Sequence, residues 1–112
     1  MSDEVGGGLL EITDANFADE IETAEGLSMV DFWAEWCGPC RLVGPVIEEL
    51  AQEYSDRVKV GKLDVVANPD TASRFNVRSI PSILFFKDGK LVDTVVGALP
   101  KASFEQKILE HV

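Results

Sequence analysis

The chain has 112 residues, of which 20 are acidic and 10 basic, so its formal net charge is −10. This length suffices for one domain with its own hydrophobic core. The acidic balance and the lack of a Lys/Arg cluster argue against a nucleic-acid-binding or membrane-surface protein, because affinity for polyphosphate needs clustered basic side chains.

The first eight residues, MSDEVGGG, lack the pattern of a secretory signal. Such a signal begins with basic residues and continues with an apolar stretch, whereas this segment carries two acids and three glycines. No apolar run in the chain is long enough to span a bilayer. The sequence therefore predicts a flexible leader over residues 1–8, a domain over residues 9–112, and a cytoplasmic location.

Strands and helices alternate in the first two thirds of the predicted domain. Strands are expected over residues 9–12, 28–34 and 58–66, where apolar residues dominate. The helices between and after them are predicted from capping residues and apolar spacing. They comprise a first helix capped by Thr13 or Asp14 that carries Phe17 and Ile21, a long helix over 39–54, and a short helix over 68–75 with Asn68 at its cap and Pro69 in its first position.

The last third predicts a hairpin and a closing helix. Asp88-Gly89 separates the apolar runs SILFF and LVDTVV, and Asp-Gly between such runs is a strong hairpin signal. Phe104, Ile108 and Val112 then lie on one face of the last helix. The order strand-helix-strand-helix-strand-helix-strand-strand-helix predicts an α/β fold: a mixed five-stranded sheet flanked by four helices, with parallel crossovers first and an antiparallel edge last.

The two cysteines, Cys37 and Cys40, are the only thiols of the chain and stand in the stretch DFWAEWCGPCRLVGP. A structural zinc site needs four ligands, and the only other soft ligand is His111 at the opposite end of the chain, so no metal site is expected. A disulfide across so short a loop stabilises a fold very little. A reversible redox pair remains as the favoured interpretation.

The start of a helix gives such a pair distinct roles. Cys37 precedes the long helix, where unpaired N–H groups and the helix dipole favour a thiolate, and we expect it to be exposed and to attack a substrate disulfide. Cys40 lies one turn further on, is expected to be shielded, and would resolve the mixed disulfide. Pro39 suits the first helical position, and Pro45 is expected to kink the helix.

WCGPC after VDFWA, with SIPS forty residues later and VGA near the end, resembles the thioredoxin family over residues 9 to 111. The resemblance implies the thioredoxin fold and a protein-disulfide reductase that needs no metal or bound cofactor. It also implies disulfide-containing client proteins and a thioredoxin reductase as partners, and we expect a monomer that binds neither nucleic acid nor membrane.

The resemblance also implies supporting roles for residues around the cysteine pair. Asp31 interrupts an apolar strand, so burial and a raised carboxyl pKa are expected, and the family's Asp here exchanges a proton with the second cysteine. Lys62 would lie near Asp31 and tune its pKa. Ile80-Pro81 would be a cis peptide facing the cysteines. The expected client-binding surface comprises Trp36, Gly38, Pro39, Ile80, Pro81, Gly97 and Ala98.

Two departures from the family pattern and two rival functions complete the sequence-based interpretation. Val66 stands where the family carries an Asp beside the active-site Trp36, and Gly44 replaces a more usual Ala. One rival is a binding or scaffold subunit, or folding helper, of the same fold with an incidental dithiol. The other is a disulfide-forming oxidant, which the Gly-Pro dipeptide and the absence of a signal peptide disfavour.

Overall fold

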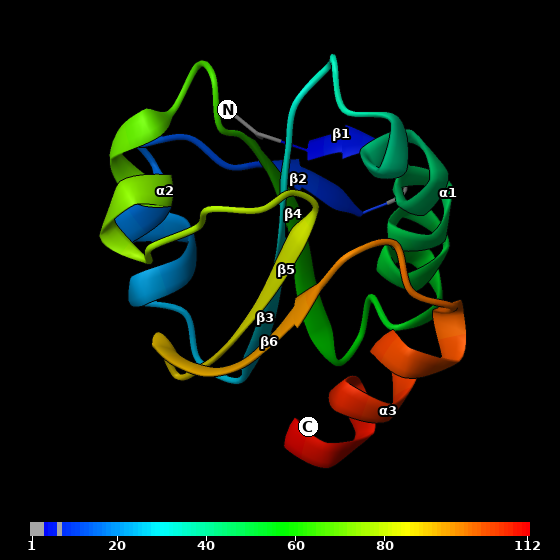
Figure 1. The fold of residues 1–112 in the computed structure, drawn as a ribbon. Helices are drawn as coiled ribbons and strands as arrows, with labels where there is room; N and C mark the ends of the chain where they lie inside the picture. The colour runs from blue at the N-terminus through cyan, green and yellow to red at the C-terminus, as the bar shows by residue number, and fades with distance from the viewer. Residues whose placement is uncertain (1–3, 7) are drawn as a thin grey trace.

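The computed structural model describes residues 4–6 and 8–112. Its elements follow the order strand, strand, π-helix, strand, helix, strand, helix, strand, strand, helix (Figure 1). They are β1 (Glu4–Gly6), β2 (Leu9–Glu11), η1 (Ala18–Glu22), β3 (Leu27–Trp33), α1 (Gly38–Glu53), β4 (Val58–Asp64), α2 (Pro69–Arg74), β5 (Ser82–Lys87), β6 (Lys90–Val96) and α3 (Lys101–His111).

The strands form one mixed sheet in the spatial order β1-β2-β4-β3-β5-β6. β4 pairs in parallel with both β2 and β3, whereas β5 runs antiparallel to β3 and β6. The parallel pairs follow from the helical crossovers, and the antiparallel pair follows from the hairpin at Asp88 and Gly89. Both turn residues have positive φ, 51° and 83°, as the tight hairpin requires. The predicted mixed fold is therefore confirmed.

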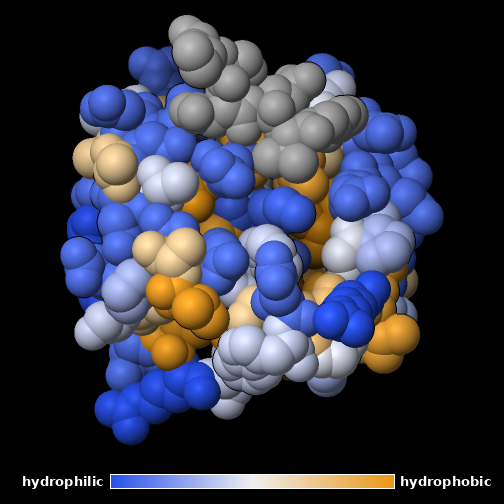
Figure 2. Space-filling view, turned by 90° about the horizontal axis from the view of Figure 1, so that it is seen from above, coloured by the Kyte–Doolittle hydropathy of each residue, from blue (hydrophilic) through white to orange (hydrophobic). Residues whose placement is uncertain are grey.

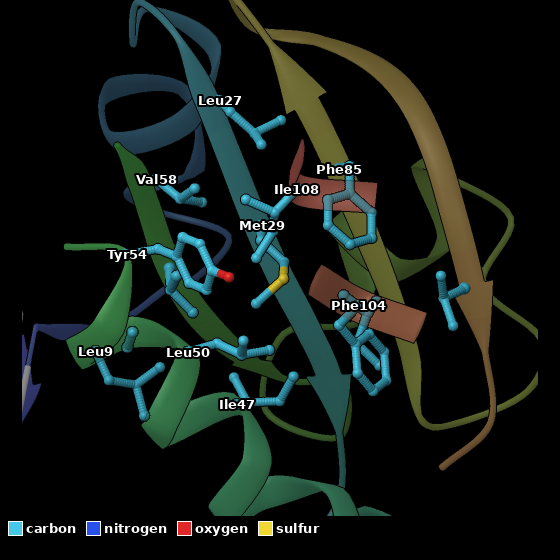
Figure 3. Packing of buried hydrophobic residues seen from close by; sticks show 14 of the residues in the cluster. Leu9, Leu27, Met29, Ile47, Leu50, Tyr54, Val58, Phe85, Phe104 and Ile108 are labelled. Atoms are coloured by element: carbon cyan, nitrogen blue, oxygen red, sulfur yellow. The ribbon is translucent and has the colours of Figure 1, made fainter. Parts of the chain in front are cut away.

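Helices cover both faces of the sheet, and each face has its own hydrophobic cluster (Figure 1). α1 and α3 pack on one face, where Ile47, Leu50, Phe104 and Ile108 meet the strands (Figure 3). η1 and α2 pack on the other face. Val112 does not share the buried face of α3 as predicted: it follows the helix and is 48% exposed.

β1 is a sixth strand that the sequence does not predict. It pairs antiparallel with β2, with Glu4 opposite Leu10 and Gly6 opposite Leu9. This short, glycine-rich segment has no apolar alternation, so its pairing depends on the free edge that β2 offers rather than on a local pattern. The predicted flexible leader also includes residues 1–3 and 7, which lie outside the described residues. The five predicted strands correspond to β2 through β6.

Asp14 caps a different helix from the one predicted. η1 has no side-chain cap, and its turn is preceded by a reciprocal pair of bonds between Thr13 and Asn16. The Asp14 carboxylate instead accepts hydrogen bonds at the start of α2, from Thr71 N and Oγ1 and from Asp70 N. Partial burial opposes ionisation of Asp14, but these bonds outweigh it and lower its pKa. Pro69 begins α2 and Asn68 is its N-cap residue, both as predicted, although the Asn68 side chain makes no cap hydrogen bond.

Gly44 is a position in α1 where alanine should stabilise the fold. A Cβ built at Gly44 meets nothing within 4 Å. Alanine loses less backbone entropy than glycine on forming a helix, which favours Gly44→Ala. The following Pro45 crowds the new methyl group and offsets part of this gain. We therefore expect Gly44→Ala to raise the free energy of unfolding by about 0.5 kcal/mol. Urea denaturation of the oxidised protein measures this.

Gly26→Ala is the matched control for Gly44→Ala. Its Cβ would also meet nothing within 4 Å, but Gly26 has a φ of +79°. The left-handed backbone should cost an alanine about 1 kcal/mol. The two substitutions are therefore expected to shift stability in opposite directions, and a shift in the same direction would contradict the assignment to backbone conformation.

Candidate active site

The cysteine pair lies where β3 leads into α1. Cys37 is the N-cap of α1, with extended backbone (φ −89°, ψ 109°), and its Sγ accepts a hydrogen bond from the backbone N–H of Cys40 at 3.2 Å. The two residues are joined as a disulfide, with their Cα atoms 5.3 Å apart. The helix begins at Gly38, so Pro39 is its second residue rather than its first as predicted, but it still lies in the first turn, where its missing N–H costs nothing. The predicted placement of the pair is confirmed.

Both cysteines are buried in this disulfide form. Each is 4% exposed, and they pack with Ala34 under the partly buried side chains of Trp33, Val65 and Ile80. The predicted shielding of Cys40 is confirmed, but the predicted exposure of Cys37 is wrong for the oxidised state. The reason is tertiary: the segments after β4 and before β5 cover the helix start, which no local pattern shows.

The Ile80–Pro81 peptide lies against Cys37. Its bond is cis, as the family resemblance implies, and the Cys37 Sγ lies 3.8 Å from the carbonyl oxygen of Ile80. The carbonyl of Pro81 accepts a hydrogen bond from Gly97 N at 2.8 Å, which brings the segment after β6 to the same place. The structure therefore assembles the Trp36, Ile80 and Gly97 segments around one sulfur pair.

The expected client-binding surface is only partly exposed. Trp36 is 71% exposed, and Gly38, Pro39 and Ala98 are also exposed. Ile80 and Gly97 are half-buried, and Pro81 is buried. Figure 2 looks onto this end of the molecule and shows pale and orange surface between blue hydrophilic residues.

Asp31 is buried below the cysteine pair with an unsatisfied oxygen. It lies on β3 at 3% exposure, on the face covered by α1, and its Oδ1 has no hydrogen-bond partner among the described residues. Burial raises the pKa of this carboxyl to about 7, and the positive charge of Lys62 offsets part of the rise. The expected burial and raised pKa of Asp31 are confirmed. A carboxyl with such a pKa can both accept and release a proton near neutral pH.

Lys62 lies beside Asp31, as the family resemblance implies. The two residues are direct partners in the parallel register of β3 and β4. The Lys62 ammonium lies 4.6 Å from the ring centroid of Trp33, a cation–π geometry. Trp33 therefore holds the cation at the edge of the site while its other contacts pack against the cysteine cluster.

A cavity of about 300 Å³ connects Asp31 with Cys40. Lys62 and Trp33 line it from the strands, and Gly44 and Arg41 line it from α1. Sequence reasoning missed Arg41 as a site residue. The available signal was its spacing, since residue 41 follows Cys37 by four positions and so returns to the same side of the helix.

The chain is similar in sequence to a known protein family and to several of its named members. The family model described as Thioredoxin matches residues 8–110. Thioredoxin 1 of Synechococcus elongatus is 50% identical over 101 residues, which cover 90% of this chain and 94% of the relative. Thioredoxin 2 of Chlorobaculum tepidum is 50% identical over 106 residues (95% and 97%), and thioredoxin of Staphylococcus saprophyticus is 48% identical over 104 residues (93% and 98%).

The chain belongs to the thioredoxin family. Together with the Cys37–Cys40 disulfide, membership makes the protein a thiol–disulfide oxidoreductase of the protein-disulfide reductase type. In the described part of the chain, no helix has the length and apolar character needed to cross a membrane.

Val66 is the position where the family resemblance led us to expect an Asp beside Trp36. Both side chains are exposed: Val66 is 66% exposed and Trp36 is 71% exposed. The Asp64 carboxylate instead holds this loop by accepting from Val66 N and Ala67 N, at 2.9 and 3.3 Å. Asp64 thus holds the loop that carries Val66.

Among the described residues, potential metal ligands meet on β6 and α3 rather than at the cysteine pair. Asp93, Glu110 and His111 place one ligand atom each within 4.8 Å of the others. The Lys107 ammonium lies 3.1 Å from the Asp93 carboxylate and 3.8 Å from that of Glu110, so both carboxylates already face a cation. His111, for which the sequence predicts no role, contacts Asp93 at 3.0 Å and ties α3 to β6.

Proposed function

We propose that this protein reduces the disulfides of client proteins, with Cys37 as the attacking and Cys40 as the resolving thiol. The position of Cys37 at the N-cap of α1 supports this assignment most directly, because the Cys40 N–H already points at its sulfur and the helix dipole favours a thiolate there. Cys40 lies inside the first turn and lacks this N-cap position, so it is the resolving thiol in the proposal.

The Cys37–Cys40 dithiol supplies both electrons that the reduction of one client disulfide requires. The Cys37 thiolate attacks one sulfur of the client disulfide, forming a mixed disulfide and releasing the other client sulfur as a thiolate, which takes up a proton. The Cys40 thiol then loses its proton and attacks the Cys37 sulfur, which releases the second client thiol. The client gains two electrons and two protons, and the Cys37–Cys40 pair ends as a disulfide.

Asp31 accepts the proton that Cys40 loses in this proposal. The shared cavity and the pKa of about 7 support the role, because a carboxyl with this pKa can accept and release a proton near neutral pH. Lys62 tunes this exchange by favouring the ionised form of Asp31. Water in the cavity is the natural carrier between the two groups.

The client-binding surface and the partners follow from the family. Clients dock on Trp36 and the surrounding surface of Gly38, Pro39, Ile80, Pro81, Gly97 and Ala98 through apolar contacts and backbone pairing. A thioredoxin reductase, linked to NADPH or ferredoxin, returns the disulfide to the dithiol. We further propose a cytoplasmic monomer with residues 1–8 as a leader to the domain at 9–112, taking part in electron transport and binding neither nucleic acid nor membrane.

The reduction potential of the Cys37–Cys40 pair tests the direction of this reaction. Equilibration with a dithiol buffer, followed by thiol trapping, is expected to give a value at or below the cytosolic glutathione poise of roughly −220 to −260 mV. A markedly more oxidising value would make the protein a disulfide donor. A cellular role that survives replacement of both cysteines by serine would instead support the binding-module alternative.

A further inference from the structure

The cavity between α1 and the sheet has a buried floor and an exposed rim. Its floor consists of buried residues, which include Asp31, Cys40 and Ile47. Its rim consists of exposed residues, which are Glu35, Arg41 and Glu48. Half-buried residues lie between the two levels: Trp33 and Lys62 on the strands and Gly44 on α1. Water that enters at the rim therefore passes Gly44 on its way to Asp31.

Gly44 leaves a gap in the helix wall of this cavity. Residues four apart on a helix share a face, so Gly44 lies on the same face as Cys40 and Glu48. These two neighbours carry side chains, whereas a Cβ built at Gly44 meets no atom of the described residues within 4 Å. Carbon atoms in contact lie about 3.5–4.0 Å apart, so the described part of the chain leaves this space open.

The floor of the cavity holds a carboxyl that needs water. Asp31 is 3% exposed, and its Oδ1 has no hydrogen-bond partner among the described residues. Buried polar atoms without a protein partner are normally hydrogen-bonded by internal water. A cavity of about 300 Å³ has ample room for such water.

Burial outweighs the charged groups that face Asp31. Lys62 on β4 lowers its pKa, but burial is the larger influence and raises the pKa to about 7. The other charged groups that line the cavity are Glu35 in the loop before α1 and Arg41 and Glu48 on α1. All three are exposed, so solvent screens their charges from Asp31. The amount of water that reaches Asp31 is therefore what a change in the cavity wall would alter.

We propose that Gly44 is a positioning residue that leaves room for water beside the Asp31 carboxyl. The inference rests on the proposed function, in which water carries the proton between Cys40 and Asp31. The methyl group of an alanine would take the place of about one water molecule. Water stabilises the ionised carboxylate more than the neutral acid, because hydrogen bonds to charged groups are stronger. An alanine at this position should therefore favour the protonated form of Asp31.

The experiment compares the titration of Asp31 in oxidised wild-type protein and in oxidised Gly44→Ala, followed by carboxyl ¹³C NMR. The loss of one water hydrogen bond should strengthen proton binding about threefold to tenfold, which moves the titration midpoint upward by about 0.5 to 1 pH. Alanine suits a helix, so the variant is expected to fold. A midpoint that stays the same or falls would overturn the proposal.

The stability of the same variant gives a second measurement. Native stability is lost as the pH rises toward the raised pKa of Asp31, and a still higher pKa extends this loss to higher pH. The gain in unfolding free energy expected for Gly44→Ala should therefore be complete at pH 5 and smaller at pH 9. A gain that does not change with pH would contradict the proposal, because an effect on the helix alone is independent of pH.

Gly38→Ala is the matched control. Gly38 also belongs to α1, and a Cβ there meets no described atom within 4 Å, but this residue is exposed and lies outside the residues that line the cavity. Its alanine variant should leave the Asp31 titration unchanged. An equal rise of the midpoint in both variants would show that alanine acts through the helix, and the role of Gly44 would be refuted.

Single-turnover kinetics separate this inference from the proposed function. If Asp31 accepts the Cys40 proton, the pH profile of client release in Gly44→Ala should move upward by the same amount as the titration. A shifted titration with an unshifted profile would support the role of Gly44 and refute the proton role of Asp31. An unshifted titration would refute the role of Gly44 whatever the profile shows.

Discussion

Replacing Cys40 by serine is expected to leave a protein that captures client disulfides but cannot release them. Cys37 keeps its place at the helix start, so it should still attack a client and form a mixed disulfide. Without the resolving thiol the adduct persists, and catalysed turnover of insulin disulfides should fall to the uncatalysed rate. Mass spectrometry of the trapped adduct and an insulin reduction assay measure the two effects.

Cys37→Ser is the matched control for this trap. It should lose turnover to the same extent but form no adduct, because Cys40 lacks the N-cap position at which the helix dipole and a backbone N–H favour a thiolate. The two serine variants differ only in which sulfur remains. An adduct that formed equally well on Cys40 would reverse the assigned roles of the two cysteines.

Replacing Asp31 by asparagine is expected to stabilise the oxidised protein at high pH. Burial raises the Asp31 pKa from 3.8 in the unfolded chain to about 7 in the fold, so the native state holds this proton more tightly. Native stability is then lost as the pH rises from the unfolded to the folded pKa. At pH 8 the accumulated cost is about 4 kcal/mol, and asparagine, which cannot ionise, avoids it.

The difference in unfolding free energy between Asp31→Asn and wild type is the quantity to follow. Urea denaturation from pH 4 to pH 9 should show this difference growing with pH and levelling off above the folded pKa. Asp56→Asn, at an exposed carboxyl, controls for the change in net charge. A difference that stays constant across this range would show that Asp31 does not titrate with a raised pKa.

The same variant tests the proton role of Asp31. If this carboxylate accepts the Cys40 proton, the release of client from the mixed disulfide should slow in Asp31→Asn, and its dependence on pH should change. Rapid-mixing measurements of a single turnover separate this step from the attack by Cys37. An unchanged pH profile would exclude Asp31 as the proton acceptor while leaving its effect on stability intact.

The elements and the chemistry of this protein could be predicted from sequence because they depend on near neighbours. Apolar spacing outlines α1, Asp88-Gly89 sets the hairpin turn, and two cysteines three residues apart at a helix start define a redox pair. Each of these signals involves only a few neighbouring residues, so it can be recognised in the amino-acid sequence. The WCGPC motif adds the family, and with it the cis Ile80–Pro81 bond.

Contacts between distant segments were decided only by the tertiary structure. Asp14 caps α2 rather than η1, because folding brings Thr71 to a carboxylate 57 positions earlier in the chain. The oxidised Cys37 is buried because Val65 and Ile80 cover it, and β1 forms because β2 leaves an edge free. The Asp31 Oδ1 has no hydrogen-bond partner among the described residues, and Lys62, its register neighbour on β4, lies over Trp33. Which distant residues come into contact depends on how the strands align in the sheet. The spacing of residues along the chain does not predict these contacts.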